Sequence, residues 1–323
     1  MTELRDRVAE RIAEVWPSGE LTSFENLPGG HSGITCRATV MLPAGDLERV
    51  VVKATPPGRP PVGRHDVLRQ ARILSLLAAT GHVRVPEVLL QDDGDEPYFV
   101  MRWHSGESVE PVLDPAQHLG PEIVEARALS AVEALAELHG VQVPDEPVLT
   151  PVQELQRWIP TMHTVDADLR AGSEAVEAAL LGSVPPPAGP AIVHGDFRLG
   201  NALCTGGSVN VVIDWEIWSV GDPRVDLGWL VLFCDPGNFP GVGNAACSMP
   251  PVQALREAYE HATGAAVEQF GWFEAMARYK MAAIMGNNLA RHRSGRYDDP
   301  FQEKLVPTIR RLIEGAASLL PRP

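Results

Sequence analysis

Two short apolar runs, each followed at once by polar residues, constrain this chain most strongly. The run Ala191–Val193 leads into His194–Asn201, which reads HGDFRLGN, and the run Val211–Ile213 leads into Asp214 and Trp215. Because both runs contain β-branched residues and are bounded by polar ones, they predict short buried strands. The polar residues at the ends of these strands are therefore candidates for a functional site.

The oxygen-bearing side chains of these segments match the requirements of phosphoryl transfer from ATP. That reaction needs a carboxylate near the acceptor hydroxyl, and an amide oxygen and a second carboxylate that hold Mg²⁺ against the phosphates. Asp196 is the predicted base. Asn201 and Asp214, thirteen residues apart, are the predicted Mg²⁺ ligands because Mg²⁺ prefers oxygen. An isolated His-x-Asp is more often a packed His beside a turn-capping Asp, but the complete set favours a site.

The same residues resemble the aminoglycoside phosphotransferase family, a branch of the protein-kinase-like superfamily. Members of that family carry His-Gly-Asp-x-x-x-x-Asn and a later Ile-Asp-Trp. Here these motifs are His194–Asn201 and Ile213–Trp215, and Gly221–Gly228 resembles the segment that follows them in the family. The resemblance extends over about residues 20–315.

The resemblance implies an α+β fold of the bilobal protein-kinase-like kind, with ATP and Mg²⁺ as cofactors. A small, mainly antiparallel β N-lobe is expected over 1–103 and a larger helical C-lobe over 104–323. The hydrophobic pattern itself predicts helix, three strands, helix and two strands, and then mostly helices. The predicted ranges are 2–15, 21–27, 34–42, 49–55, 66–79, 86–90 and 98–103, followed by 122–139, 225–234, 252–263, 267–291 and 301–320.

A glycine-rich turn and a lysine are the predicted nucleotide contacts of the first lobe. Gly29, Gly30, Ser32 and Gly33 lie between the first two predicted strands, where backbone N–H groups can approach phosphate oxygens. Lys53 alternates with core residues on the third strand, where kinases place the lysine that holds the α- and β-phosphates. A plain hairpin and an exposed strand lysine are the alternatives, but the order turn, strand, lysine, helix favours a phosphate site.

Gln70 marks a departure from the family pattern. The resemblance implies a Glu on the helix after Lys53, paired with that lysine, and the chain has Gln70 instead. A glutamine can accept a hydrogen bond from Lys53 without adding charge, which puts catalytic efficiency in question. By resemblance, Met101 backs the adenine, while the Arg102 carbonyl and the His104 amide contact its edge. A simple apolar core strand is the alternative for this segment.

Two further residues of the motif, and the segment after it, bear on the reaction. Arg198 is predicted either to stabilise charge on the transferring phosphoryl group or to pair with a nearby carboxylate. His194 is expected to hold the loop by hydrogen bonding rather than to react, and Asp226 to brace it. No Ala-Pro-Glu motif and no Ser/Thr/Tyr-rich activation segment follows Asp214. Their absence argues against a protein kinase and for a small-molecule hydroxyl acceptor.

The charge and composition of the chain limit its partners. The formal net charge of −15 argues against nucleic acid and fits either an acidic surface or a cationic acceptor such as an aminoglycoside. No apolar run is long enough to span a membrane and no signal core is present, so a cytoplasmic protein without a membrane partner is expected. The four cysteines include no closely spaced pair such as Cys-x-x-Cys, which argues against a zinc site. The sequence does not predict an oligomeric state.

Basic residues late in the chain bear on the class of acceptor. Lys280, Asn287 and Arg291 share one helix face by spacing, and such a cluster suits an anionic acceptor better than an aminoglycoside. Pairing of these bases with acidic residues is the alternative. The chain also looks most like the family branch found fused to, or beside, acyl-CoA dehydrogenases, which implies hydroxyacyl-CoA substrates. An aminoglycoside kinase, a nucleotide-binding module without turnover and an Mg²⁺-dependent hydrolase remain the alternative functions.

Overall fold

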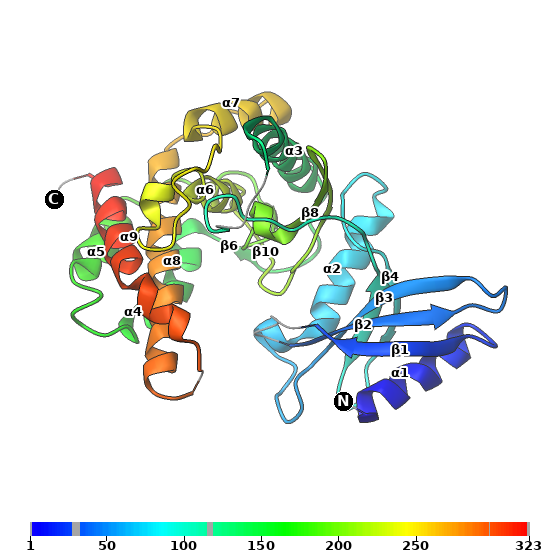
Figure 1. Cartoon of the computed structure of the whole chain (residues 1–323). Helices are drawn as coiled ribbons and strands as arrows, with labels where there is room; N and C mark the ends of the chain where they lie inside the picture. Colours follow the sequence, from blue (N-terminus) through cyan, green and yellow to red (C-terminus); the bar gives the residue numbers. More distant parts are fainter. Residues whose placement is uncertain (1, 28–32, 115–118, 297, 322–323) are drawn as a thin grey trace. The chain divides into compact units, whose positions relative to one another are not determined.

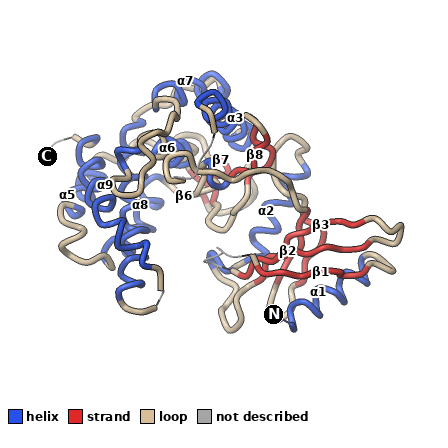
Figure 2. The backbone as a smooth tube through the Cα atoms, viewed as in Figure 1, coloured by secondary structure: helices blue, strands red, loops and turns tan. Residues whose placement is uncertain are grey.

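The computed structural model describes residues 2–27, 33–114, 119–296 and 298–321, and the chain forms two compact units. The first unit comprises Met1–Ser105 together with Val211–Ile217, and the second comprises Gly106–Asn210 and Trp218–Pro323. The first unit is thus built from two separate stretches of chain. Helices predominate in the second unit, as the blue segments of Figure 2 show.

Within the described residues, a five-stranded antiparallel sheet forms the body of the first unit, in the order β1-β2-β3-β5-β4 (Figure 1). Its strands are β1 (Glu20–Asn26), β2 (Ile34–Met41), β3 (Leu47–Ala54), β4 (Val88–Asp92) and β5 (Tyr98–Arg102). The accompanying helices are α1 (Thr2–Val15), the 3₁₀ turn η1 (Gly63–His65) and α2 (Val67–Ala79). Asp66 caps α2, because its carboxylate accepts the Arg69 N–H at 2.8 Å.

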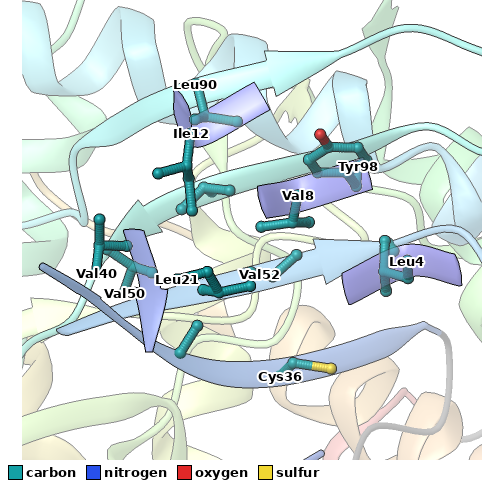
Figure 3. Close-up of a cluster of buried hydrophobic side chains, with 13 residues drawn as sticks. Leu4, Val8, Ile12, Leu21, Cys36, Val40, Val50, Val52, Leu90 and Tyr98 are labelled. Atoms are coloured by element: carbon teal, nitrogen blue, oxygen red, sulfur yellow. The ribbon is translucent and has the colours of Figure 1, made fainter. Parts of the chain in front are cut away.

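The core of the first unit lies between α1 and one face of the sheet (Figure 3). Leu4, Val8 and Ile12 recur every four residues, so they share one side of α1, and all three are buried. Alternate residues of β3 between Val50 and Ala54 are buried in the same cluster. Because side chains alternate along a strand, Lys53 points to the opposite face of the sheet.

Helices and short strands make up the second unit. Its helices are α3 (Pro121–His139), α4 (Pro151–His163), α5 (Ser173–Gly182), α6 (Arg224–Leu232), α7 (Val252–Thr263), α8 (Phe270–Arg293) and α9 (Val306–Leu319), with 3₁₀ turns η2 (Leu199–Asn201), η3 (Pro236–Asn238) and η4 (Pro300–Leu305). Strands β6 (Val148–Leu149), β10 (Ser219–Gly221) and β7 (Ala191–Val193) form one sheet in that order, and β8 (Ala202–Thr205) pairs with β9 (Ser208–Val212). The HGD loop (His194–Asn201) connects β7 to β8.

Helix α8 is the most enclosed long element of the second unit. It packs against α4, α6 and α9, and its buried residues occur on every side between Phe270 and Leu289. A helix that is apolar or buried all round belongs to the interior of a domain. Among the described helices, none has both the length and the apolar character that crossing a membrane requires.

Most of the predicted elements are confirmed to within a few residues, and the helices at 2–15 and 252–263 match to the residue. The helix predicted from residue 267 starts later, at Phe270, because Gln269 adopts a left-handed φ of 51°. The helix predicted from residue 301 starts as the 3₁₀ turn η4 and becomes α-helical at Val306, where Pro307 suits a first turn. Helices α4 and α5 lie where the sequence predicted only a generally helical region.

Replacing Ile12 by Ala is expected to lower the free energy of unfolding by about 2–5 kcal/mol, because this fully buried side chain fills space between α1 and the sheet. Glu10→Ala, at an exposed position of the same helix, is the matched control and is expected to stay within about 0.5 kcal/mol of the parent. Urea titration followed by circular dichroism measures both. Equal stability of the two variants would contradict the packing of α1.

Candidate active site

The backbone of the HGD loop is fixed by a buried carboxylate. The N–H groups of His194 and Gly195 donate to Asp226 Oδ2 at 2.6 Å and Oδ1 at 2.7 Å. Asp226 is fully buried in the first turn of α6, and His139 Nε2 lies 3.4 Å from its Oδ2. Burial alone would raise the pKa of Asp226, but the contacts with His139, His194 and the Gly195 N–H outweigh burial and lower it. The carboxylate therefore stays charged and braces the loop.

The ring of His194 lies inside the loop that it begins. It is fully buried, and its Nδ1 accepts the Asp196 N–H at 3.2 Å. It packs against the Phe197 ring in a T-shaped arrangement, with the ring centroids 5.9 Å apart. These contacts support the expected role of His194 in holding the loop, whereas a role in the chemistry itself stays a prediction.

Both carboxylate oxygens of Asp196 are held by donors. Asn201 Nδ2 donates to Asp196 Oδ2 and to the Asp196 carbonyl, both at 2.8 Å, and Trp229 Nε1 donates to Oδ1 at 2.6 Å. The Asp196 side chain is 25% exposed, so these donors orient it without enclosing it. Because Asn201 directs its NH₂ group to Asp196, its amide oxygen is the atom left for a metal ion.

Arg198 lies between two carboxylates. Its Nη1 is 3.4 Å from Glu110 Oε2, its Nε is 3.5 Å from Asp196 Oδ1, and its guanidinium lies over the Phe233 ring at 5.6 Å. A Cβ at Gly200 would come within 1.9 Å of Arg198 Nη1, so glycine at this position gives the guanidinium room. The structure therefore shows the ion-pair alternative for Arg198, and its effect on a phosphoryl group stays a prediction.

Glu110 is a buried acid beside the HGD loop. Its Oε2 accepts the Gly200 N–H at 3.1 Å, and its Oε1 has no hydrogen-bond partner among the described residues. Burial raises the pKa of Glu110 to about 7, although Arg198 and the Gly200 N–H oppose that rise. Such an acid is partly protonated at neutral pH, so its attraction for Arg198 depends on pH.

In the first unit, Lys53 pairs with Asp214. Lys53 Nζ lies 3.0 Å from Asp214 Oδ1, and 17% of the lysine side chain is exposed. The segment that carries Asp214 is attached by the Val212 N–H, which donates to the Arg84 carbonyl at 2.7 Å. The Trp215 indole donates back to the Val212 carbonyl at 3.0 Å. Asp214 itself has a φ of +72°, a conformation that costs a non-glycine residue on the order of 1 kcal/mol or more.

The predicted phosphate turn is described only in part. Three of its residues lie outside the described residues: Gly29, Gly30 and Ser32. Gly33 is described, and a Cβ there would lie 3.1 Å from the Ala54 carbonyl oxygen, so this glycine permits a close approach to β3. Gln70 is buried in α2, and within the described residues no hydrogen bond joins its side chain to Lys53.

The end of β5 carries the predicted adenine contacts. Met101 is buried, and the Arg102 side chain pairs with Glu48 and Glu87 on neighbouring strand ends. The backbone N–H of His104 donates to no atom of the described residues, so it is available to a ligand. Burial, aided by the Arg102 charge, lowers the pKa of the His104 ring, and its Nε2 is buried without a partner in the described part of the chain.

The two predicted Mg²⁺ ligands belong to different units: Asp214 to the first and Asn201 to the second. Among the described residues, no group of three or more His, Cys, Asp or Glu side chains could hold a metal ion. Mg²⁺ often takes only one or two protein carboxylates and completes its shell with phosphate oxygens and water. A carboxylate and an amide oxygen are each a ligand type that Mg²⁺ accepts.

The sequence analysis missed two residues near Asp196, namely Trp229 and Glu110, and it expected a third, Lys280, in a different environment. Trp229 follows Asp226 by three, so both lie on one face of α6, and that spacing was the available signal. Glu110 lies in an irregular segment and gives no periodic signal. Lys280, expected in a basic cluster on a helix face, is instead 1% exposed, and its ammonium donates to the Gly195 carbonyl.

Comparison with known proteins shows a protein family whose model matches this chain, and solved structures with a similar fold. A model described as the phosphotransferase enzyme family (APH) matches residues 32–305. The chain is 24% identical over 270 residues to human acyl-CoA dehydrogenase family member 11, covering 77% of this chain and 34% of that protein. This chain spans about a third or less of the length of the curated relatives that it matches.

Solved structures show the same fold at low sequence identity. A putative aminoglycoside phosphotransferase from Ralstonia eutropha has a TM-score of 0.77 and 20% identity, over 98% of this chain and 99% of that chain. A thermostable mutant of the aminoglycoside phosphotransferase APH(4)-Ia, solved with AMP-PNP and hygromycin B, has a TM-score of 0.62 and 17% identity, over 96% and 99%. The predicted α+β fold, an antiparallel N-terminal sheet followed by a largely helical region, is confirmed.

Glu110→Gln is expected to stabilise the protein more at pH 8 than at pH 5. A carboxyl whose pKa is raised on folding contributes stability that is complete below its unfolded pKa of about 4.3 and is lost as pH rises through about 7. Glutamine has no such loss, so the unfolding free energy, variant minus parent, should rise by about 1–3 kcal/mol between these pH values.

Denaturant titrations at pH 5 and pH 8 measure this difference. Glu122→Gln, at an exposed position of α3, is the control and should show no comparable change with pH. A difference for Glu110→Gln that does not vary with pH would contradict the buried acid.

Proposed function

The chain belongs to the phosphotransferase enzyme family, and on that premise we propose that it transfers a phosphoryl group from ATP to a hydroxyl group of a small molecule. The observation that carries this proposal is the setting of Asp196. Its two carboxylate oxygens are oriented by Asn201 and Trp229 while a quarter of the side chain stays exposed. A carboxylate held in this way is suited to orient an acceptor hydroxyl and take its proton.

The first unit supplies the proposed nucleotide contacts. Lys53 would hold the α- and β-phosphates, and its ion pair with Asp214 keeps the ammonium directed to that end of β3. The unused N–H of His104 and the carbonyl of Arg102 would contact the adenine edge, with Met101 behind it. Asn201 and Asp214 are the proposed ligands of Mg²⁺, which when bound neutralises charge on the phosphates.

The acceptor that we propose is a metabolite, with a hydroxyacyl-CoA as the first class to test. The curated relatives support this choice because they are acyl-CoA dehydrogenase family members, whereas the structural neighbour crystallised with hygromycin B supports an aminoglycoside. The basic residues late in α8 do not favour either a hydroxyacyl-CoA or an aminoglycoside. Arg293 pairs with Asp166 at 3.0 Å and with Glu303 at 2.8 Å, so its charge is already neutralised.

A nucleotide-binding role without turnover is the second candidate, and Gln70 is the observation that favours it. In kinases a glutamate at this place pairs with the phosphate lysine, and here Lys53 pairs with Asp214 instead. The two functions differ in outcome: a binding module takes up Mg-ATP but forms no phosphorylated product with any acceptor.

Asp196→Asn is expected to reduce phosphoryl transfer by about 10²- to 10⁴-fold, because the amide cannot accept the hydroxyl proton. Binding of Mg-ATP, measured by calorimetry, should stay nearly unchanged, because Asp196 is proposed to act on the acceptor. Asp298→Asn, at a side chain that is 96% exposed, is the matched control. Loss of nucleotide binding in a folded Asp196→Asn protein would refute the role given to Asp196.

The acceptor test measures ADP formation with Mg-ATP over a paired panel of hydroxyacyl-CoAs and aminoglycosides. Turnover on one class that disappears in Asp196→Asn would identify both the reaction and the acceptor class. ATP binding without turnover on either class would favour the second candidate, and Gln70→Glu would then be expected to raise activity if a missing carboxylate limits the enzyme.

A further inference from the structure

A buried lysine lies directly behind the HGD loop. Lys280 projects from α8 and is 1% exposed. Its ammonium donates to the carbonyl oxygen of Gly195, the residue immediately before Asp196. A buried cation is costly unless other groups compensate its charge, so its position next to the proposed base calls for a physical explanation.

Two indole rings compensate this charge. Lys280 Nζ lies 4.3 Å from the centroid of Trp229 and 4.8 Å from that of Trp158. A cation over an aromatic face is attracted by the negative potential of the ring, and more strongly where water is excluded. Within the described residues Lys280 forms no ion pair, so the rings and the Gly195 carbonyl are its direct partners.

Each of these indoles donates its N–H to a carboxylate. Trp229 Nε1 donates to Asp196 Oδ1 at 2.6 Å, and Trp158 Nε1 donates to Glu154 Oε1 at 3.0 Å. The ammonium therefore lies between two rings whose edges hold carboxylates. A cation on the face of an indole draws electron density from the ring and so strengthens its N–H as a donor.

The Gly195 peptide is held from both directions. Its N–H donates to Asp226 Oδ1 at 2.7 Å, and its carbonyl accepts from Lys280. Gly195 has a φ of +86°, a conformation that glycine adopts readily. An anion on one side and a cation on the other thus fix the turn that presents Asp196.

We propose that Lys280 is a positioning residue of the phosphoryl-transfer site: its charge orients Asp196 through the Gly195 carbonyl and the Trp229 indole. The expected effect of Lys280 on the reaction rate rests on the proposed function. The electrostatic interaction between Lys280 and Asp196 does not, because it can be measured without turnover. Lys280 touches neither nucleotide nor acceptor in this scheme, and it acts through the two groups that hold Asp196.

The charged groups that face Lys280 come from several elements. Glu154 and Arg157 lie on α4, Asp196 lies in the HGD loop and Asp226 lies on α6. Burial lowers the pKa of Lys280 below its usual value, while the three carboxylates oppose that change and Arg157 adds to it. As pH rises, Lys280 should therefore lose its charge at a lower pH than an ordinary lysine does. Activity that depends on this charge should begin to fall at that lower pH.

The first test measures the ionisation of Lys280 by NMR of protein labelled with ¹³C at lysine Cε. The chain has only three lysines, Lys53, Lys280 and Lys304, so Lys53→Met and Lys304→Met assign the remaining signal. The Lys280 signal is expected to titrate below the ordinary lysine value of about 10.4. In Asp196→Asn it should titrate lower still, because a carboxylate that favours the cation is gone. An identical titration in parent and Asp196→Asn would overturn the proposal.

The second test compares Lys280→Met and Lys280→Arg with Lys304→Met, a surface control outside the site. Lys280→Met should lower kcat by about 10- to 100-fold with little change in KM for ATP, because a small misplacement of a reacting group is costly. Lys280→Arg should restore part of the rate and move the alkaline limb of the pH–rate profile to higher pH. A kcat of Lys280→Met equal to that of Lys304→Met would overturn the proposal. If no acceptor supports turnover, the proposed function fails, and the NMR titration still decides the role of Lys280.

Discussion

The carboxylate of Asp226 is the contact on which the geometry of the HGD loop depends. The backbone leaves β7 with two successive N–H groups that have no strand partner, and one buried side chain accepts both. His139 approaches the same carboxylate and is itself bonded to Tyr259 at 2.6 Å, which joins α3 and α7 to the brace. An unpaired buried N–H group or carboxylate destabilises the folded state. Each hydrogen-bond partner in this group therefore stabilises the burial of the others.

Charges of alternating sign surround the proposed base. Asp226 and Lys280 hold the Gly195 peptide, while Arg198 lies within 3.5 Å of both Asp196 and Glu110. Arg198 shares its charge between Asp196 and the buried Glu110, so these contacts form a network rather than an isolated surface salt bridge. Such networks orient a functional group at some cost in stability, which is common where chemistry is proposed.

The sequence predicted secondary structure well, but it predicted contacts between residues far apart in the chain poorly. Hydrophobic spacing placed α1, α7 and the five strands of the first sheet because those patterns depend on near neighbours along the chain, and the HGD motif identified its own loop, whereas the short strands β6, β8 and β10 were not predicted. The partners of that loop come from elsewhere: Glu110 from an irregular segment, Trp229 from α6 and Lys280 from α8. Spacing put Lys280 on one helix face with Asn287 and Arg291, but only the packing of α8 decides that Lys280 is buried while the other two are partly exposed.

The discontinuity of the first unit has a consequence for synthesis on the ribosome. Its sheet is complete by residue 102, yet the segment that carries Asp214 follows only after more than a hundred residues of the second unit. Until that segment emerges, Lys53 lacks its carboxylate and the Arg84 carbonyl lacks the N–H of Val212. Domains usually fold in the order in which they are made. Here the earlier unit is finished by a later part of the chain, so a fragment that ends after residue 105 would bury Lys53 without the carboxylate that pairs with it.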